Sequence, residues 1–187
     1  MNRLFTQLSE LDISILRFIH HNRITALDGF LYYASFATSF VSISILVVIL
    51  FLFIKNKSSE IRHKFFKLLA VLVFSAIVSL SLKYSIVRER PFVNYPDIQK
   101  LSEAGNSSFP SGHTIEAFAI AFAVSTLFPK RKYIVAVFLW AFLIAYSRMA
   151  LGVHYPFDVL AGILTGVGVS YLILKAFDLQ LWKKAAN

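Results

Sequence analysis

Long apolar runs separated by short polar segments are the main feature of this sequence. The runs cover residues 26–54, 68–87, 114–128, 134–151 and 159–174. About 20 helical residues, at ~1.5 Å each, cross the ~30 Å hydrocarbon layer of a membrane. The first run is longer, so it predicts either one tilted helix or a short helix followed by a spanning helix, with the break near Ser35, Thr38 and Ser39. The pattern therefore predicts an all-α integral membrane bundle of five to six transmembrane helices.

The N-terminal segment has a different pattern. Residues 4–21 alternate apolar side chains with polar ones, and Glu10, Asp12 and Arg17 interrupt any apolar core of signal-peptide length. This favours an amphipathic helix, within an interfacial segment 1–25, that lies on the membrane surface. The alternative is a segment that packs outside the membrane. We also expect no cleaved signal, so that the first membrane helix directs insertion.

Composition supports a membrane protein made of one domain. The 187 residues are 57% hydrophobic, and their mean hydropathy is +0.67. This is too apolar for an ordinary soluble domain, so residues 1–187 are interpreted as a single membrane domain. The sequence contains no cysteine, which excludes disulfides, thiolate catalysis and cysteine-based metal sites.

The net charge of +9 is unevenly distributed. If each apolar run crosses the membrane once, the basic connections 55–67, 130–132 and 175–184 share one side, which positive-inside statistics make cytoplasmic. The other side carries residues 88–110, 111–113 and 148–158. In a bacterial inner membrane this is the extracytoplasmic face. Because topology explains the charge, we expect the bilayer and a lipid as partners and no nucleic acid.

Three polar clusters occur at helix ends on that second face. In the first, Lys83 precedes Arg90 by seven residues, or two helical turns, and Pro91 follows Arg90 directly. If the helix persists to Pro91, both cations point along one face. The alternative is that they snorkel toward lipid headgroups.

The second cluster, Ser111, Gly112 and His113, stands where a polar loop meets an apolar run. The first N–H groups of a helix have no intrahelical partner, so such an end attracts anions. Gly112 permits close backbone approach, and His113 is able to titrate near neutral pH. A simple helix cap is the alternative.

The third cluster contains Arg148, His154 and Asp158. Tyr155 and Pro156 are suited to open the last helix, which places the Asp158 carboxylate one turn from the imidazole. A carboxylate on one ring nitrogen leaves the other as a nucleophile or base, although such pairs are also structural. Ionisable groups cost roughly 2.5–3.5 kcal/mol each inside a membrane, so their convergence on one face indicates a function.

Together these clusters resemble the three-part signature of the type 2 phosphatidic acid phosphatase superfamily, which includes membrane lipid phosphatases and soluble haloperoxidases. The resemblance covers residues 83–158. It rests on Lys83-(six residues)-Arg90-Pro91, Pro110-Ser111-Gly112-His113 and Ser147-Arg148-(five residues)-His154-(three residues)-Asp158. The small size is similar to that of bacterial undecaprenyl pyrophosphate phosphatases.

The resemblance implies a catalytic role for each motif. His154 would attack phosphorus and form a phosphohistidine, Asp158 would orient it, and His113 would protonate the leaving oxygen and then activate water. The phosphoryl oxygens would be held by Lys83, Arg90, Ser111, Gly112 and Arg148. No metal or cofactor is expected.

The resulting hypothesis is a metal-independent lipid phosphatase, acting first of all on undecaprenyl pyrophosphate. Phosphatidylglycerophosphate, phosphatidic acid and lipid A phosphates remain alternative substrates. Phosphotransfer to a lipid acceptor and non-enzymatic binding or transport of an anionic lipid are the other functions considered. Arg88 and Glu89 are interpreted as a hydrated surface pair, and Glu116 as an acid that either acts on His113, pairs with a cation or faces solvent. The remaining histidines, His20, His21 and His63, have no motif around them.

Overall fold

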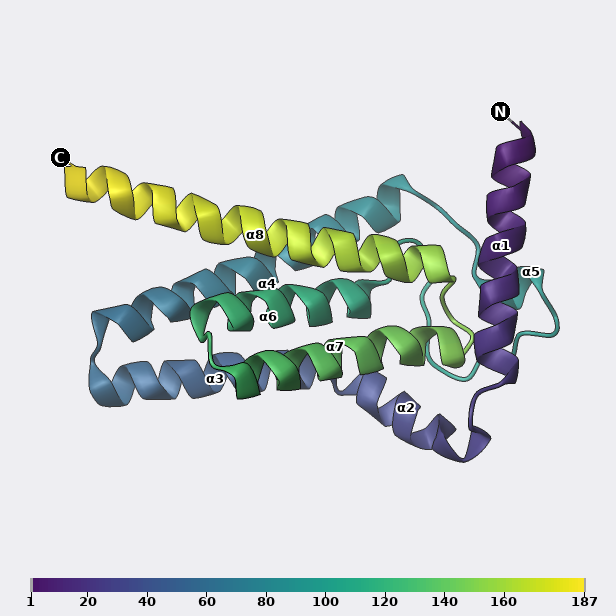
Figure 1. The fold of residues 1–187 in the computed structure, drawn as a ribbon, viewed down its shortest axis with the longest axis horizontal. Helices are drawn as coiled ribbons and strands as arrows, with labels where there is room; N and C mark the ends of the chain where they lie inside the picture. Colours follow the sequence, from purple (N-terminus) through teal and green to yellow (C-terminus); the bar gives the residue numbers. More distant parts are fainter. Residues whose placement is uncertain (1, 187) are drawn as a thin grey trace.

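A computed structural model describes residues 2–186 (Figure 1). All regular secondary structure in the described residues is helical, as predicted. Its elements are α1 (Asn2–His21), a 3-10 turn (Thr25–Leu27), α2 (Asp28–Phe36), α3 (Thr38–Asn56), α4 (Ser59–Ser85), α5 (Pro91–Asn94), α6 (Gly112–Leu127), α7 (Arg131–Ala150) and α8 (Pro156–Ala186).

Five helices run along the bundle. Within the described residues, four are long and apolar enough to cross a membrane, namely 38–56, 59–85, 131–150 and 156–179. The fifth, α6, has 16 residues and lies at the centre, where it packs against α3, α4, α7 and α8. Most of its side chains are buried by these neighbours. The bundle thus has five long helices, the lower of the predicted numbers of five to six. Helix α2, with nine residues, is too short to add a sixth span.

The long first apolar run is divided into two helices. The break falls at Ala37, and α2 packs against α7 while α3 continues along α4 and α6. At the break, the Thr38 hydroxyl donates to the Ser35 carbonyl at 2.7 Å, and the Ser42 hydroxyl donates to the Thr38 carbonyl at 3.1 Å. The small polar residues are thus satisfied locally, and the predicted short helix followed by a spanning helix is confirmed.

Helix α1 crosses one end of the bundle, against α7 and α8 (Figure 1). Asp12, Leu16 and His20 are spaced four residues apart and are all buried, whereas Leu11 and Phe18 are exposed. The alternative of a packed N-terminal segment is therefore correct for one face, and attachment of the other face to the membrane surface stays a prediction. The connections α3–α4 and α6–α7 lie at the opposite end of the bundle, together with the C-terminus.

Close contact between α6 and α8 depends on two glycines one turn apart. A Cβ atom on Gly162 would lie 2.9 Å from the Ser111 carbonyl oxygen, and one on Gly166 would lie 2.4 Å from the Ile115 carbonyl oxygen. Small residues at this spacing let two helix backbones approach each other. This contact fixes the start of α6 against the start of α8, where the motif residues lie.

Candidate active site

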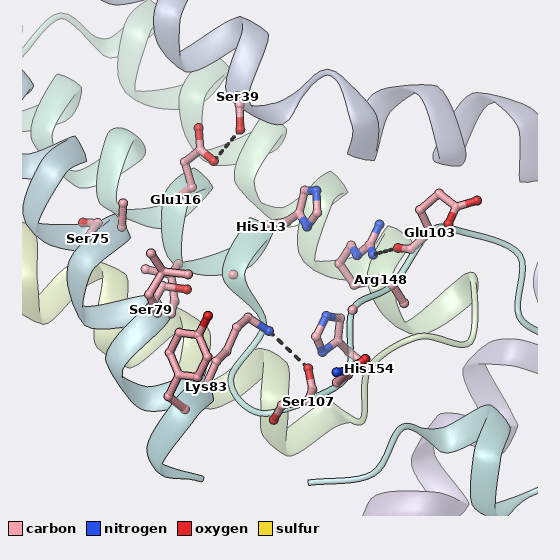
Figure 2. A pocket seen from close by; sticks show the side chains of 18 of the residues that line it. Ser39, Ser75, Ser79, Lys83, Glu103, Ser107, His113, Glu116, Arg148 and His154 are labelled. Atoms are coloured by element: carbon pink, nitrogen blue, oxygen red, sulfur yellow. Dashed lines mark hydrogen bonds between the residues drawn. The ribbon is translucent and has the colours of Figure 1, made fainter. Parts of the chain in front are cut away.

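One cavity of about 1000 Å³ collects side chains from all three sequence motifs. It lies among the ends of α4, α6 and α7 and the loop before α6 (Figure 2). The motif residues that line it are Lys83, Arg90, Gly112, His113, Arg148 and His154. The predicted convergence of cations and histidines is present in the structure.

The first motif reaches the cavity by a route other than a continuous helix. Helix α4 ends at Ser85, and Arg90 is extended (φ −79°, ψ 154°), so the predicted helix through to Pro91 is wrong. Lys83 Nζ donates to the Ser107 carbonyl at 3.2 Å. The Arg90 guanidinium donates from Nη2 to the same carbonyl at 2.9 Å and from Nε to the Gly105 carbonyl at 2.6 Å. Loop carbonyls therefore hold both cations in place.

Arg148, at the end of α7, is almost completely buried. Its Nη1 donates to the hydroxyls of Ser35 and Ser102, and its Nη2 donates to the Glu103 carbonyl at 3.3 Å. Its Nε is buried and has no hydrogen-bond partner. A buried guanidinium N–H without an acceptor is costly, so this group is available to an anionic ligand in the cavity.

His154 is positioned by a tight turn after α7. The Arg148 carbonyl accepts from the N–H groups of Val153 and His154, each at 3.2 Å. Gly152 supplies the positive φ of 73° that the turn needs, and a Cβ there would lie 2.2 Å from the Gln99 carbonyl oxygen. Both the dihedral angle and the contact require glycine at this position.

The contacts of the His154 ring define its tautomer. Nε2 lies 3.2 Å from Nη1 of Arg90, a group that only donates, so Nε2 must carry the lone pair and Nδ1 the proton. Nδ1 faces Oδ2 of Asp158 at 3.6 Å and has no hydrogen-bond partner. Burial, with the charges of Arg148 and Arg90, lowers the pKa of His154 to about 3, while Asp158 opposes this shift. The imidazole is therefore neutral at physiological pH, as a nucleophile must be.

Asp158 lies behind His154, outside the cavity lining. Its Oδ2 accepts from the Tyr155 backbone N–H at 2.9 Å, and Pro156 occupies the first turn of α8. The Asp158 carboxylate therefore caps the start of α8 by binding the N–H of Tyr155, three residues earlier. This contact, with Pro156 in the first turn, both starts the helix and orients the carboxylate.

The second motif starts α6 as predicted, but Ser111 does not serve as expected. Ser111 is the residue before the helix, is fully buried and is absent from the cavity lining. Its N–H donates to the Asp158 carbonyl at 3.0 Å, and its hydroxyl accepts from Thr114 at 2.8 Å. The expectation that the Ser111 N–H holds phosphate is therefore wrong for this structure. Gly112 and His113 do line the cavity, at the end of α6 where N–H groups have no intrahelical acceptor.

Glu116 also lines the cavity, one turn after His113. The Ser39 hydroxyl of α3 donates to its Oε2 at 2.8 Å (Figure 2). Glu116 is partly buried, and it has a hydrogen-bond partner in addition to any contact with solvent. The carboxylate joins α6 to α3 in the wall of the cavity.

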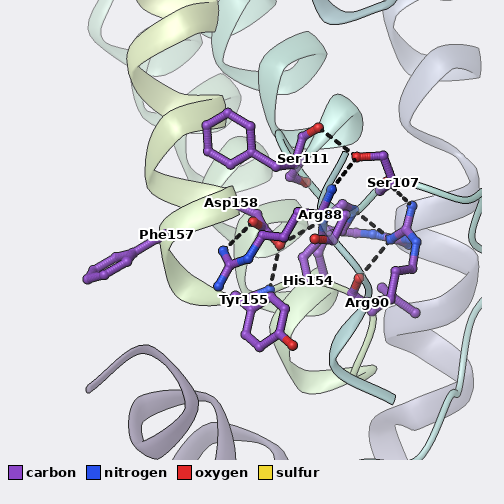
Figure 3. Close-up of polar contacts among 12 residues, drawn as sticks. Arg88, Arg90, Ser107, Ser111, His154, Tyr155, Phe157 and Asp158 are labelled. Atoms are coloured by element: carbon purple, nitrogen blue, oxygen red, sulfur yellow. Dashed lines mark hydrogen bonds and ion pairs between the residues drawn. The ribbon is translucent and has the colours of Figure 1, made fainter. Parts of the chain in front are cut away.

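Sequence reasoning missed two residues next to the site. Arg88 is not part of a hydrated surface pair, because it bridges Asp158 and Asp12 (Figure 3). Asp12 is fully buried. The signal in the sequence was an acidic residue on the same helical face as Leu16 and His20 of α1, where a buried stripe should be apolar.

His20 lies outside the cavity lining and has a structural role. Its Nε2 accepts from the Gln99 N–H at 3.1 Å, so the ring proton is on Nδ1, which donates to the Ala150 carbonyl at 2.8 Å. The ring therefore ties α1 to the end of α7 and to the loop before α6. Leaving His20 out of the site agrees with these contacts.

The model of the PAP2 superfamily matches residues 64–182. The chain is 33% identical over 163 residues to the bacitracin transport permease protein BcrC of Bacillus licheniformis, covering 85% of this chain and 77% of that protein. It is 27% identical over 164 residues to undecaprenyl-diphosphatase BcrC of Bacillus subtilis, covering 86% and 79%.

A solved structure has the same fold. The transmembrane PAP2-type phosphatidylglycerolphosphate phosphatase of Bacillus subtilis superposes with a TM-score of 0.75 at 26% identity. The superposition covers 93% of this chain and 87% of that chain. The matched family region contains all three motifs and every residue of the cavity lining except Ser39, Ser42 and Ile43 of α3.

Proposed function

The chain belongs to the PAP2 superfamily, and from this premise we propose that it is a metal-independent lipid phosphatase that acts through a phosphohistidine at His154. The observation that carries the proposal is the His154 ring itself. It is neutral, its Nε2 lone pair faces Arg90 in the lining of a cationic cavity, and an acid stands behind its Nδ1. This is how a histidine nucleophile is prepared.

The reaction would proceed in two displacements. Nε2 of His154 attacks the terminal phosphorus, and the bond from that phosphorus to the leaving oxygen breaks while His113 gives this oxygen a proton; the leaving oxygen is the bridging oxygen of a lipid pyrophosphate or the ester oxygen of a lipid monophosphate. Asp158 stabilises the positive charge that develops on the ring. His113 then takes a proton from water, the water oxygen attacks phosphorus, and the P–N bond breaks to release inorganic phosphate.

Three cations would stabilise the phosphoryl group as charge builds on its oxygens. Lys83 and Arg90 come from the first motif and Arg148 from the third, and each is fixed by loop carbonyls or hydroxyls before any ligand arrives. Preorganised donors in a site shielded from water are the largest source of catalysis in many enzymes. The unpartnered Nε of Arg148 is a donor ready for a phosphoryl oxygen.

The shape of the cavity supports a lipid substrate. Away from the cations it continues between α3 and α4, where its lining becomes apolar with scattered serines. Ile43, Val73 and Leu80 belong to this lining and are 56%, 46% and 55% exposed. A lipid tail is able to leave the cavity laterally there and stay in the bilayer, while its phosphate reaches His154.

Undecaprenyl pyrophosphate is the proposed first substrate, because a relative carries the name undecaprenyl-diphosphatase. Phosphatidylglycerophosphate is the next, because a protein of the same fold is a phosphatidylglycerolphosphate phosphatase. Phosphatidic acid and lipid A phosphates complete the set. The cationic groups recognise the phosphoryl group, which all four share.

For the membrane orientation, we propose that the site faces the extracytoplasmic side of a bacterial inner membrane. The basic α3–α4 and α6–α7 connections lie at the end of the bundle opposite the site. Positive-inside statistics put such connections in the cytoplasm. Helix α1 then lies on the outer surface with the site.

Two other functions use the same geometry. A phosphotransferase would pass phosphate from His154 to a lipid acceptor, and a transport protein would only bind an anionic lipid, which the permease name of one relative brings to attention. Binding alone gives no reason for a neutral histidine with an acid behind it. We therefore rank hydrolysis first and transfer second.

The test is phosphate release by purified protein in detergent with EDTA, comparing the four substrates. The wild type should release phosphate from at least one, with undecaprenyl pyrophosphate fastest. Folded His154→Ala should release none. Labelled phosphate that stays on the wild-type protein without release would favour transfer, and neither release nor labelling would favour lipid binding.

A further inference from the structure

A buried chain of charges connects the N-terminal helix to the catalytic acid. Arg88 Nη1 donates to Oδ1 of Asp158 at 2.6 Å, and its Nη2 donates to Oδ2 of Asp12 at 2.7 Å. Asp12 and Asp158 are both fully buried, and the Arg88 side chain is 30% exposed. Arg88 thus uses two different nitrogens to join two carboxylates that are 146 residues apart in sequence.

Arg88, the central residue of this chain of charges, is held in place by several further contacts. The Arg88 backbone N–H donates to the Ser107 hydroxyl at 3.3 Å, and its carbonyl accepts from the Ser108 N–H at 2.8 Å. Its guanidinium carbon lies 3.8 Å from the centre of the Tyr155 ring, which is the contact distance of a cation–π pair. Arg88 therefore has little freedom to leave Asp158.

Asp12 makes a second contact that bears on His154. Its Oδ1 accepts from the Phe157 backbone N–H at 2.9 Å, in the first turn of α8 (Figure 3 shows Phe157 beside Asp158). Free N–H groups at a helix start are normally bound by a residue of the same chain segment, but here α1 provides the acceptor. Asp12 therefore holds both the arginine and the helix start that carry Asp158.

Charge balance explains why two acids are present. An arginine paired with Asp158 alone would neutralise the carboxylate that must stabilise positive charge on His154. Asp12 gives Arg88 a second anion, so the three groups together keep one negative charge facing Nδ1 of His154, 3.6 Å from Oδ2. Burial raises the pKa of Asp12, while hydrogen bonds from Arg88 and Phe157 lower it.

We propose that Asp12 and Arg88 are positioning residues for the phosphatase reaction: they fix the orientation and charge of Asp158 and, through it, of the His154 ring. Neither residue lines the cavity, so neither touches the substrate. The N-terminal helix is then part of the catalytic unit. This inference rests on the proposed function of His154.

The structure offers a matched control for docking of α1. Arg17, also on α1, makes a two-contact ion pair with Asp97 at 2.8 and 3.1 Å, and Asp97 belongs neither to the cavity lining nor to the Asp12–Arg88–Asp158 charge chain. Both side chains of this pair are partly exposed, at 44% and 37%. Arg17→Gln removes an ion pair of α1 and leaves all three residues of the Asp12–Arg88–Asp158 charge chain in place.

The experiment measures kcat, KM and the thermal unfolding midpoint in detergent for wild type, Asp12→Asn, Arg88→Gln, the double variant and Arg17→Gln. Both single variants should lose about ten- to a hundredfold in kcat with KM within threefold, because misplacing a catalytic group by about 1 Å costs up to a hundredfold. The double variant should lose no more than the worse single variant, and Arg17→Gln should match wild type.

Several results would overturn the inference. They are a kcat within twofold of wild type in either folded single variant, an equal loss in Arg17→Gln, or unfolding of both single variants, which would make the chain structural. If Asp12→Asn alone unfolds, Arg88→Gln decides. Wild type without any turnover would instead refute the proposed function, and the inference with it.

Discussion

Replacement of Gly166 by alanine should separate the two helices that carry the catalytic groups. A Cβ there would lie 2.4 Å from the Ile115 carbonyl oxygen and 3.1 Å from the Ala119 nitrogen, whereas ordinary contact begins at 3.4 Å. Both neighbours are backbone atoms, so no rotamer change relieves the clash. Helices α6 and α8 must move apart by about 1 Å at this point.

The magnitude follows from two opposing terms. Overpacking a close contact costs about 1–3 kcal/mol, and alanine in place of glycine inside a helix returns about 0.5–1 kcal/mol. Gly166→Ala should therefore lose up to about 2.5 kcal/mol of stability. Because His113 is on α6 and Asp158 is on α8, the same movement should lower kcat/KM by tenfold or more, up to about a hundredfold.

Gly168 is the matched control, two residues along the same helix. A Cβ there has no neighbouring atom within 4 Å, so Gly168→Ala gains the stability that alanine brings to a helix interior without the clash. Denaturant unfolding and phosphate release in detergent are measured for both variants. If Gly166→Ala is as stable and as active as Gly168→Ala, the argument that this contact sets the site geometry is refuted.

Two further predictions concern Arg148 and His154. Arg148→Lys should lower kcat/KM by at least about tenfold, because an ammonium cannot hold the Ser35 and Glu103 contacts and also offer a directed N–H to phosphate; steady-state kinetics near wild type would contradict this role. The thermal unfolding midpoint should fall as pH drops from about 6.5 toward 3, because folded His154 has a pKa of about 3 against an ordinary 6.5, and the unfolded chain binds this proton first. Folded His154→Ala should lose less over that range, and an equal loss would show that His154 is not responsible.

The sequence was sufficient for the bundle and for most of the site. Apolar length predicts the spanning helices, and motif spacing predicts that Lys83, His113, Arg148 and His154 meet, because each lies at a helix end on one face. These are properties of local sequence. They do not depend on how distant segments pack.

What the sequence could not predict depends on contacts between distant segments. Arg88 has the appearance of a solvated charge until Asp12, 76 residues away, is placed beside it. The one-face alignment of Lys83 and Arg90 required a helix that persists to Pro91, but α4 ends at Ser85 and the carbonyls of a later loop hold Arg90 in an extended conformation. Similarly, the Ser111 N–H is unavailable because the start of α8 supplies its acceptor.

The most direct test of the account is to find where phosphate is bound during turnover. Wild-type protein and His154→Ala are mixed with ³²P-labelled lipid substrate, quenched in base, which preserves phosphohistidine, and digested, and the labelled peptide is identified. The account predicts label on His154 in the wild type, and neither label nor turnover in folded His154→Ala. Label on another residue, or continued turnover by folded His154→Ala, would contradict it.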